Sequence, residues 1–331
     1  MSASSGGCRI APIALATGAP NKMKIVLGTR GSRLALAQAE IAKGVLLSSG
    51  LVEAVDIRII KTTGDQRLDL RLNDSGKTFE KGLFTKELEQ ALLNKEIDLA
   101  VHSLKDLPTE PVEHLIIDAV LPREDPVDVL VSKIPGGLDA LPKGSLIATG
   151  SPRRSQQITY LRPDIQVCDV RGNVPTRLEK LVRNREWSAI ILARAGLRRL
   201  HLAPEQGERL GFLDTNLFVT DLTGLLPAAG QGAIALQCRA NDSSVRAILS
   251  RINDPVSWDC VQAEREFLRL VGGGCNVPIG VYARVKGDTM TLAAIVFEAA
   301  GKMRQGSVAV PLKASLDAAQ VLYREIYAED R

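Results

Sequence analysis

The sequence has few aromatic residues, few histidines and no closely spaced cysteines. Aromatic residues make up 4% of the 331 positions, too few for the platforms on which proteins stack nucleic-acid bases. The five cysteines are an odd number without a CxxC pair, and only three histidines accompany them. We therefore expect neither a disulfide framework nor a metal site.

The chain also lacks long apolar runs and a large net charge. No stretch approaches the roughly 18 consecutive apolar residues of a membrane span. Its 42 Lys and Arg against 38 Asp and Glu give a net charge of +4, which by itself does not indicate a nucleic-acid partner. No P-loop motif and no GxGxxG turn after a strand is present, so nucleotide binding has no support. We expect a soluble protein of the cytoplasm that binds neither nucleic acid nor membrane.

The first 22 residues lack the apolar block of a secretory signal. They are rich in Ser, Ala and Gly, and Arg9 and Lys22 are their only cations, which argues against export. We predict that residues 1–22 form a disordered extension and that the folded protein starts near Met23. Import into an organelle is the alternative that this composition leaves open.

The order of strand and helix patterns predicts three domains. Residues 23–122 and again 123–220 alternate apolar strand patterns with helical patterns, which is typical of α/β domains. Residues 221–240 combine a glycine loop with a strand, and we expect them to return the chain to the first domain. Residues 241–331 begin with one helix that continues through Leu268, followed by three strands and a final helix, and they predict a smaller α+β domain.

Local signals place several element ends in the first domain. Ser32 follows the apolar run KIVLG and is predicted to cap a helix. The polar stretch 62–82 lacks periodicity, and both a lid over a site and a plain surface loop fit it. Thr85 begins the next helix, and the buried strand pattern IDLAVHSL ends at Lys105 and Asp106.

Arginines follow four of the expected strands at their carboxyl ends, where α/β sheets bind their ligands. They are Arg30 and Arg33, Arg153 and Arg154, Arg171 and Arg177, and finally Arg194, Arg198 and Arg199. Guanidinium groups bind phosphate and carboxylate equally well, so the arginines alone do not decide which of the two the ligand carries. A ligand with many carboxylates, lying in a cleft between the two α/β domains, fits the dispersal best.

The motif GSPRRS places two of these arginines at a helix start. Ser151 is predicted as the N-cap and Pro152 as the first helical residue, which puts Arg153 and Arg154 in the first turn. A helix N-terminus disfavours each cation by about 0.3–1 kcal/mol. An anion beside them is one explanation, and exposure of both side chains to water is the other.

Asp106 is an acidic residue within this basic field. At the end of its strand an ionised carboxylate would stabilise a positive charge that develops on a ligand. A simple salt bridge with Lys105 is the alternative. His102, within the same strand pattern, is predicted to be structural.

The stretch LVGGGCNVPIG contains a single cysteine, Cys275, directly after three glycines. Glycines there free the backbone and remove side chains. The pattern fits either a sharp turn or a bulky group that must approach the sulfur.

Read in order, these stretches resemble the porphobilinogen deaminase family, also called hydroxymethylbilane synthases, from Met23 onward. The resemblance rests on TRGSRLALAQ, KGLFTKELE, DLAVHSLKDLPT, ATGSPRR, VRGNVPTRL, AIILARAGLRRL, PAAGQGAIALQCR and GGGCNVPIG. It implies two α/β domains built like periplasmic binding proteins with a cleft between them, plus the smaller α+β domain. It also implies a monomeric transferase of tetrapyrrole biosynthesis that joins four porphobilinogen molecules head to tail, releases ammonia, and frees the linear tetrapyrrole by hydrolysis.

The resemblance further implies a cofactor and a set of site residues. Cys275 would carry a covalent dipyrromethane through a thioether, and Asp106 and Lys105 would be catalytic. Contacts to the cofactor would come from Arg30, Ser32, Lys105, Asp106, Thr149, Ser151, Arg153, Arg154, Arg171 and Gly172. Contacts to the substrate would come from Arg30, Arg33, Lys77, Lys81, Arg171, Arg177, Arg199 and Gln231.

The sequence departs from the family pattern at two positions. Pro152 stands where leucine is usual, and Gly272 where an acidic residue is usual. Two other functions remain as alternatives. A non-catalytic anion-binding protein predicts a signal peptide and an unused cysteine, and a cysteine hydrolase predicts a histidine that activates Cys275, for which no motif is present.

Overall fold

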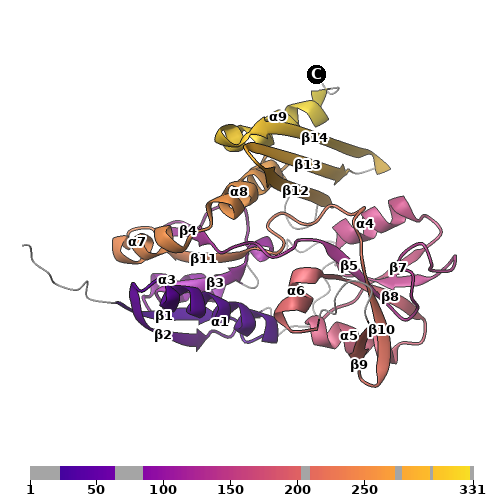
Figure 1. Cartoon of the computed structure of the whole chain (residues 1–331), viewed down its shortest axis with the longest axis horizontal. Helices are drawn as coiled ribbons and strands as arrows, with labels where there is room; N and C mark the ends of the chain where they lie inside the picture. The colour runs from indigo at the N-terminus through magenta and orange to yellow at the C-terminus, as the bar shows by residue number, and fades with distance from the viewer. Residues whose placement is uncertain (1–22, 64–84, 203–208, 273–277, 299–300, 329–331) are drawn as a thin grey trace, which may run out of the picture.

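The computed structural model describes residues 23–63, 85–202, 209–272, 278–298 and 301–328. These residues form three lobes, each built around one β-sheet (Figure 1). The predicted fold class is confirmed: two α/β domains are joined by a smaller C-terminal sheet domain. The predicted extension and most of the predicted 62–82 loop lie outside the described residues.

The first sheet has the strand order β2-β1-β3-β11-β4. Strand β1 runs parallel to β2 and β3, whereas β11 runs antiparallel to β3 and β4, so the chain returns to this sheet late in the sequence. The strands are β1 (Met23–Thr29), β2 (Val52–Ile59), β3 (Leu99–Ser103), β4 (Leu115–Val120) and β11 (Ile234–Arg239). Its helices are α1 (Arg33–Ser48), α3 (Lys86–Leu93) and α7 (Ser243–Ile252).

The predicted helix start at Ser32 is confirmed. The Ser32 hydroxyl accepts a hydrogen bond from the backbone N–H of Ala35 at 3.2 Å, which satisfies one free donor of the first turn. Helix α1 then buries Ala39, Ala42 and Leu46 against the sheet. This packing fixes the loop between β1 and α1 at the carboxyl end of β1.

The second sheet has the order β7-β6-β8-β5-β10-β9. Strand β6 is parallel to β7 and β8, while β5 is antiparallel to β8 and β10. The strands are β5 (Asp128–Ser132), β6 (Leu146–Ala148), β7 (Gln166–Cys168), β8 (Trp187–Ala193), β9 (Arg209–Phe212) and β10 (Thr215–Asp221). Its helices are α4 (Pro152–Leu161), α5 (Val174–Arg183) and α6 (Arg194–Arg199).

The third sheet is an antiparallel meander on which two helices pack. Phe267 and Leu322 reach its core from α8 and α9, where they meet Leu292 of the central strand. The strands are β12 (Ile279–Lys286), β13 (Thr289–Phe297) and β14 (Met303–Pro311), and the helices are α8 (Pro255–Leu270) and α9 (Ala318–Ile326).

The single helix predicted through Leu268 was wrong, because the structure has two. Helix α7 ends at Ile252 and α8 begins at Pro255. A residue before proline avoids the helical conformation, and Asp254 is extended, with its carboxylate capping Ser257 at 2.8 Å. The apolar periodicity continues across this break, which is why the pattern alone indicated one helix.

A buried ion pair joins the third lobe to the other two. Glu264 of α8 is 0% exposed and accepts hydrogen bonds from Arg123 Nη1 at 2.7 Å and Nη2 at 3.0 Å. The same carboxylate accepts from the backbone N–H groups of Gly230 and Ala283, both at 2.8 Å. The Arg123 guanidinium also lies over the ring of Tyr282, 5.5 Å from its centre.

We expect Glu264→Gln to lower the free energy of unfolding by about 3 kcal/mol or more, because it leaves the buried Arg123 without its counter-charge. Urea denaturation of both proteins measures the difference. Glu266→Gln is the matched control, since Glu266 pairs with Arg269 on the exposed side of the same helix and such pairs contribute about 1 kcal/mol or less. Equal losses in the two variants would contradict the role assigned to Glu264.

Candidate active site

The predicted start of helix α4 is confirmed, and the anion beside its arginines belongs to the protein. Ser151 caps the helix and Pro152 occupies its first turn. Arg153 and Arg154 are only 6% and 5% exposed, so neither points into water. Both contact Asp128, the first residue of β5, which is 0% exposed.

The geometry around Asp128 is that of a shared buried carboxylate. Its Oδ2 accepts from Arg153 Nη1 at 2.7 Å, and its Oδ1 accepts from Arg154 Nη2 at 2.7 Å and Nε at 3.0 Å. Burial alone would raise the pKa of Asp128, but the charges of Arg153 and Arg154 hold that pKa well below its usual value. Burial in turn lowers the pKa of Arg153.

Gln231 links this cluster to Lys105. Its amide nitrogen donates to the carbonyl of Pro126 at 2.7 Å and to Asp128 Oδ1 at 2.8 Å, and its amide oxygen accepts from Lys105 Nζ at 3.3 Å. Burial, together with the charge of Arg154, lowers the pKa of Lys105 to about 8. Gln231 itself is 1% exposed.

Lys105 and Asp106 lie in a short 3₁₀ turn, Leu104–Asp106, directly after β3. Asp106 is exposed. Its charge acts on Lys105 and also on Arg177 of α5, so the turn of the first lobe lies within electrostatic range of the second. The structure therefore brings the predicted catalytic pair close to three of the predicted arginines, Arg153, Arg154 and Arg177.

Arg171 and Arg177 extend the cationic cluster along the second lobe. Arg171 Nε donates to Asp169 Oδ2 at 2.9 Å, and Arg177 Nε donates to the carbonyl of Gly172 at 2.7 Å. Burial and the neighbouring charges of Arg154 and Arg171 lower the pKa of Arg177 to about 10. Gly172 has a φ of 115°, a conformation that favours glycine.

The remaining predicted residues lie around this cluster at different depths. Arg199 of α6 donates to the carbonyl of Gly232 at 2.6 Å, which ties the second lobe to the loop before β11. Thr149 is buried, and its hydroxyl accepts from the backbone N–H of Ser151 at 3.3 Å. Arg30 is half-buried, whereas Arg33 is exposed on α1.

His102 occupies the structural position that the strand pattern indicated. It is buried in β3, and its Nε2 lies 2.9 Å from the amide oxygen of Gln237 in the neighbouring strand. Burial, with a smaller contribution from the charge of Arg30, lowers the pKa of His102 to about 4. The imidazole is therefore neutral near pH 7.

Three predicted residues, Cys275, Lys77 and Lys81, lie outside the described part of the chain. Next to the cysteine loop, Gly272 has a φ of 70° and open space around its α-carbon. A side chain there would be strained by the backbone conformation. The departure from the family pattern at Gly272 thus matches the turn that the chain makes after α8.

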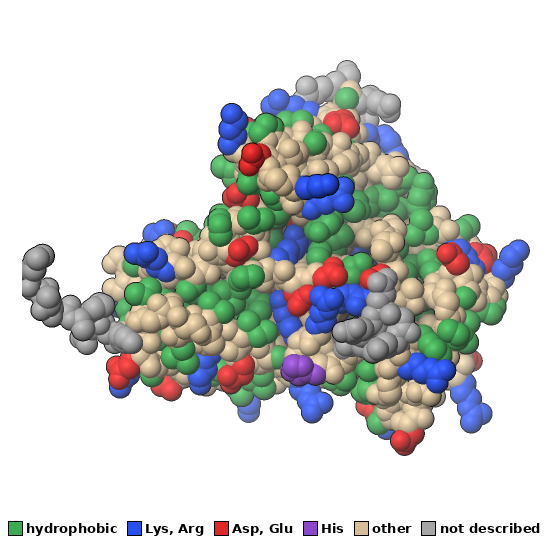
Figure 2. Space-filling view, viewed as in Figure 1, with side chains coloured by type: hydrophobic (Ala, Val, Ile, Leu, Met, Phe, Trp, Pro, Cys, Tyr) green, Lys and Arg blue, Asp and Glu red, His purple; other side chains and the backbone are tan. Residues whose placement is uncertain are grey.

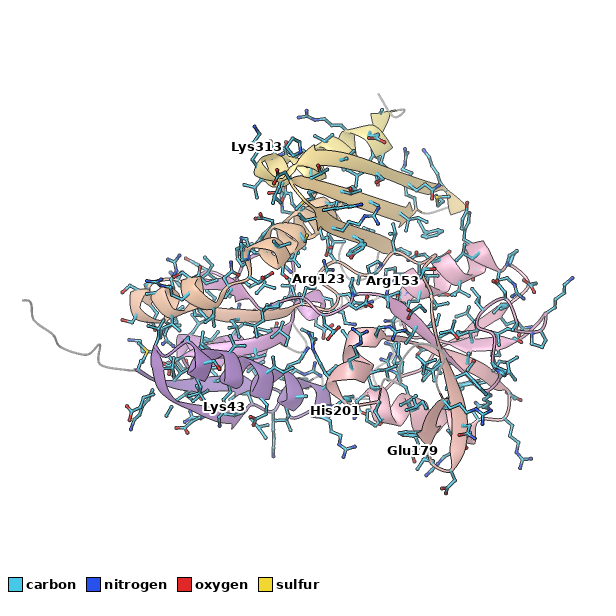
Figure 3. The ribbon with its side chains drawn as sticks, viewed as in Figure 1. Lys43, Arg123, Arg153, Glu179, His201 and Lys313 are labelled. Carbon is cyan, nitrogen blue, oxygen red and sulfur yellow. The ribbon has the colours of Figure 1, made fainter. Side chains whose placement is uncertain are left out.

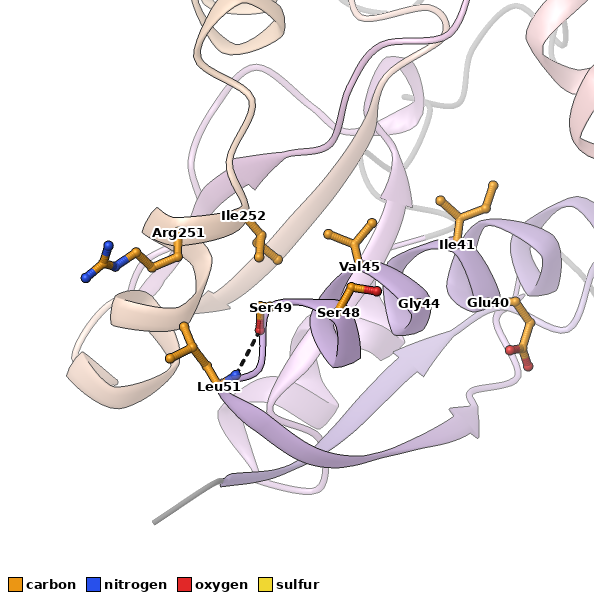
Figure 4. Close-up of a pocket in the computed structure, with 9 residues that line it drawn as sticks. All are labelled: Glu40, Ile41, Gly44, Val45, Ser48, Ser49, Leu51, Arg251 and Ile252. Atoms are coloured by element: carbon orange, nitrogen blue, oxygen red, sulfur yellow. Dashed lines mark hydrogen bonds between the residues drawn. The ribbon is translucent and has the colours of Figure 1, made fainter. Parts of the chain in front are cut away.

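The three lobes meet at the cluster. Figure 3 shows Arg123 and Arg153 at this junction, and Figure 2 shows basic and acidic side chains gathered there on the same face. A separate groove of about 620 Å³ lies between α1 and α7 on the first lobe (Figure 4). It contains none of the predicted site residues.

Asp128 is the site residue that the sequence did not reveal. It opens the apolar run DVLVS, and nothing local distinguishes it from an acid that ends a loop. The one available signal was the helix start GSPRRS, for which an anion beside the arginines was one of two explanations, without an indication of where the anion would come from.

Comparison with known proteins identifies the family of the chain. Residues 25–247 match the family model described as "Porphobilinogen deaminase, dipyromethane cofactor binding domain". Residues 258–327 match the model of the porphobilinogen deaminase C-terminal domain. The chain belongs to the porphobilinogen deaminase family.

Individual relatives of the porphobilinogen deaminase family cover most of the chain. The porphobilinogen deaminase of Chloroherpeton thalassium is 43% identical over 85% of this chain and 85% of its own length. That of Syntrophomonas wolfei is 46% identical over 83% and 86%. Among solved structures, the methionine-binding protein MetQ aligns with 71% of this chain and 92% of its own, at 13% identity and a TM-score of 0.41.

Membership in the porphobilinogen deaminase family confirms two predictions made from the sequence. The chain is a transferase of tetrapyrrole biosynthesis, and it uses a dipyrromethane cofactor. Within the described ranges, no helix is long and apolar enough to cross a membrane. In the same ranges, no group of three or more His, Cys, Asp and Glu side chains could hold a metal ion.

Proposed function

We propose that this chain is a hydroxymethylbilane synthase whose active site is the cluster around Lys105 and Asp106. Four porphobilinogen molecules and one water would give one linear tetrapyrrole and four molecules of ammonia. The observation that supports this most directly is the exposed carboxylate of Asp106, set among cationic groups that come from two lobes.

The donor set around the cluster fits a dipyrromethane. Each of its pyrrole rings carries an acetate and a propionate, and the guanidinium and ammonium groups of the cluster are the donors that carboxylates prefer. Cys275 would hold the group by a thioether, and Lys105, Arg153 and Arg154 would contact its carboxylates. When bound, the dipyrromethane supplies the pyrrole carbon to which the first substrate unit is joined.

Asp106 would accept hydrogen bonds from pyrrole N–H groups and stabilise positive charge. When the carbon–nitrogen bond of porphobilinogen breaks, ammonia leaves with the bonding electrons and the pyrrole becomes a cation. A fixed carboxylate lowers the energy of that cation far more than the energy of neutral rings. Its exposure leaves it free to meet the substrate.

The arginines would bind and orient the substrate. Arg30, Arg33, Arg171, Arg177 and Arg199 are proposed to contact its acetate and propionate groups, together with Lys77 and Lys81. Orientation of the reacting atoms removes much of the entropic barrier to joining two pyrroles. Gln231, whose side-chain amide is hydrogen-bonded within the protein, would hold the ammonium group of Lys105 in position.

Three further assignments complete the proposal. We propose that the protein acts as a monomer, since the described residues of the cluster come from the lobes of one chain, and that it acts in the cytoplasm. Its domains would comprise residues 23–122 with 221–240, then 123–220, then 241–331, except that α7 (Ser243–Ile252) packs with the first sheet. The proposed function is tested by adding porphobilinogen to the purified protein and measuring the ammonia and the tetrapyrrole released. Four molecules of ammonia per tetrapyrrole support the proposal. No consumption of porphobilinogen would refute it.

The pH dependence of kcat/KM should report the loss of the proton from Lys105. We expect kcat/KM to fall as the pH rises through about 8, because the Lys105 ammonium then loses the proton and the charge that bind substrate carboxylates. Arginine keeps its proton throughout this range, so Lys105→Arg should shift the alkaline decline to higher pH. An identical decline in both proteins would show that another group titrates.

A further inference from the structure

Asp128 holds together side chains that come from two lobes. It accepts from Arg153 and Arg154, in the first turn of α4, and from Gln231 in the loop before β11. Strand β5 belongs to the second sheet, whereas β11 belongs to the first. One buried carboxylate thus fixes groups on both sides of the junction.

The cluster around Asp128 carries a net positive charge. Two buried guanidinium groups face a single carboxylate, and Lys105 adds its ammonium group through Gln231. Positive charges that share one buried carboxylate repel one another strongly, because water is excluded. Without Asp128, the two guanidinium groups would lose the counter-charge that offsets this repulsion.

Besides their contacts with Asp128, the two arginines donate hydrogen bonds to backbone carbonyl groups. Arg153 Nη1 also donates to the carbonyl of Leu226 at 2.7 Å, and Arg154 Nη1 donates to the carbonyl of Ile191 at 3.0 Å. Each guanidinium is therefore held at more than one point. The orientation of both guanidinium groups is thus set by the protein itself.

We propose that Asp128, together with Gln231, is a positioning residue of the active site. Asp128 fixes the guanidinium groups of Arg153 and Arg154, and through the Gln231 amide it fixes the ammonium group of Lys105. Asp128 is itself closed off from the ligand, since it is fully buried. This inference rests on the proposed function, and it assigns the residue that holds the carboxylate-binding groups in place.

The charge of Asp128 affects the pKa of Lys105, which a residue that only packs would leave unchanged. The charged groups facing Lys105 are Arg153 and Arg154 on α4, Asp128 on β5, and Asp106 in its own turn. The arginines lower the pKa of Lys105, and the two carboxylates raise it. Asp128→Asn keeps the shape but removes one of the carboxylate charges, so the pKa of Lys105 must fall further.

The test compares Asp128→Asn with Asp221→Asn. Asp221 lies on β10, next to β5 in the same sheet, and pairs with the buried Arg194. It is not among the main charges that act on Lys105. Both changes remove one charge from a carboxylate that holds a buried arginine. In each protein, labelled with ¹³C-lysine, NMR measures the pKa of Lys105, whose signal is assigned by its loss in Lys105→Arg. Intact mass then gives the fraction of chains that carry the cofactor.

We expect Asp128→Asn to lower the pKa of Lys105 and to reduce turnover per cofactor-loaded chain by about 10- to 100-fold, as for residues that orient metal ligands from behind. Asp221→Asn should leave both unchanged. A wild-type Lys105 titration with full turnover in Asp128→Asn would overturn the proposal. If wild-type protein did not consume porphobilinogen, the proposed function would fail, whereas the NMR comparison would still test the positioning.

Gln231→Met provides the second arm in case Asp128→Asn does not fold. Methionine fills a similar volume without hydrogen-bonding capacity, and it leaves the ion pairs of Asp128 intact. We expect at least about a tenfold loss of turnover with unchanged cofactor content, because Lys105 loses its anchor. Full turnover in this variant would overturn the proposal.

Discussion

Replacing Cys275 with serine is expected to abolish activity and to remove a covalent mass from the protein. Freshly purified wild-type chain should exceed its sequence mass by two linked pyrrole units, because only a thiolate at this position forms the thioether to the dipyrromethane. A serine hydroxyl is too weak a nucleophile to replace it. Intact-mass spectrometry and porphobilinogen consumption measure the two effects on the same samples.

Cys168→Ser is the control for this experiment. Cys168 lies in β7, half-buried, with a thiol whose pKa is raised by burial, so it should neither carry the added mass nor affect activity. An active wild-type protein with its bare sequence mass would contradict the assignment of Cys275. So would a Cys275→Ser variant that still carries the addition.

Asp106→Asn is expected to lower kcat by at least about 100-fold while changing KM much less. Asparagine keeps the size and much of the hydrogen-bonding capacity of the side chain and removes only its charge. Only the state that follows loss of ammonia carries the positive charge that the carboxylate meets, and losing one such preorganised group typically costs about 100-fold or more.

The cofactor content of Asp106→Asn must be measured by mass before its kinetics are compared. Asp214→Asn makes the same change in an exposed turn between β9 and β10 and should behave as wild type. A rise in KM with unchanged kcat would mean that Asp106 binds ground state and transition state alike. Asp106 would then orient the substrate without stabilising the cation.

Local rules were sufficient for the helix starts. Ser32 and Ser151 each cap a helix as predicted, because a short polar side chain before an apolar periodic segment satisfies backbone donors within the same turn. The same reasoning gave an anion near Arg153 and Arg154 as one of two explanations for their place in the first turn. The identity of that anion was out of reach, since Asp128 lies 25 and 26 positions away in the sequence.

Other features were missed because their cause is not local. The β9–β10 hairpin turns at Leu213 and Asp214, both with positive φ, and no glycine marks the turn. The break between α7 and α8 lies inside a continuous apolar periodicity. The burial of both arginines of α4 depends on contacts with Leu226 and Ile191 from other segments, which no pattern near residue 153 contains.

The candidate site was predictable to the extent that strand ends gather at one edge of a sheet. Arg171 and Arg177 could be expected near the carboxyl ends of their strands, and they are found there. The extent to which their side chains are buried could not be predicted, because it depends on contacts with neighbouring lobes. Gln231 shows this most clearly: its sequence motif is a glycine loop, and its role follows only from Lys105 and Asp128 meeting on either side of it.

The central claim is that the chain builds a tetrapyrrole on a primer attached to itself. The most direct test mixes the purified protein with limiting porphobilinogen and follows its intact mass. We predict a series of species heavier than the loaded protein by one to four pyrrole units, and no such species in Cys275→Ser. Consumption of porphobilinogen without any species heavier than the starting protein would contradict the claim.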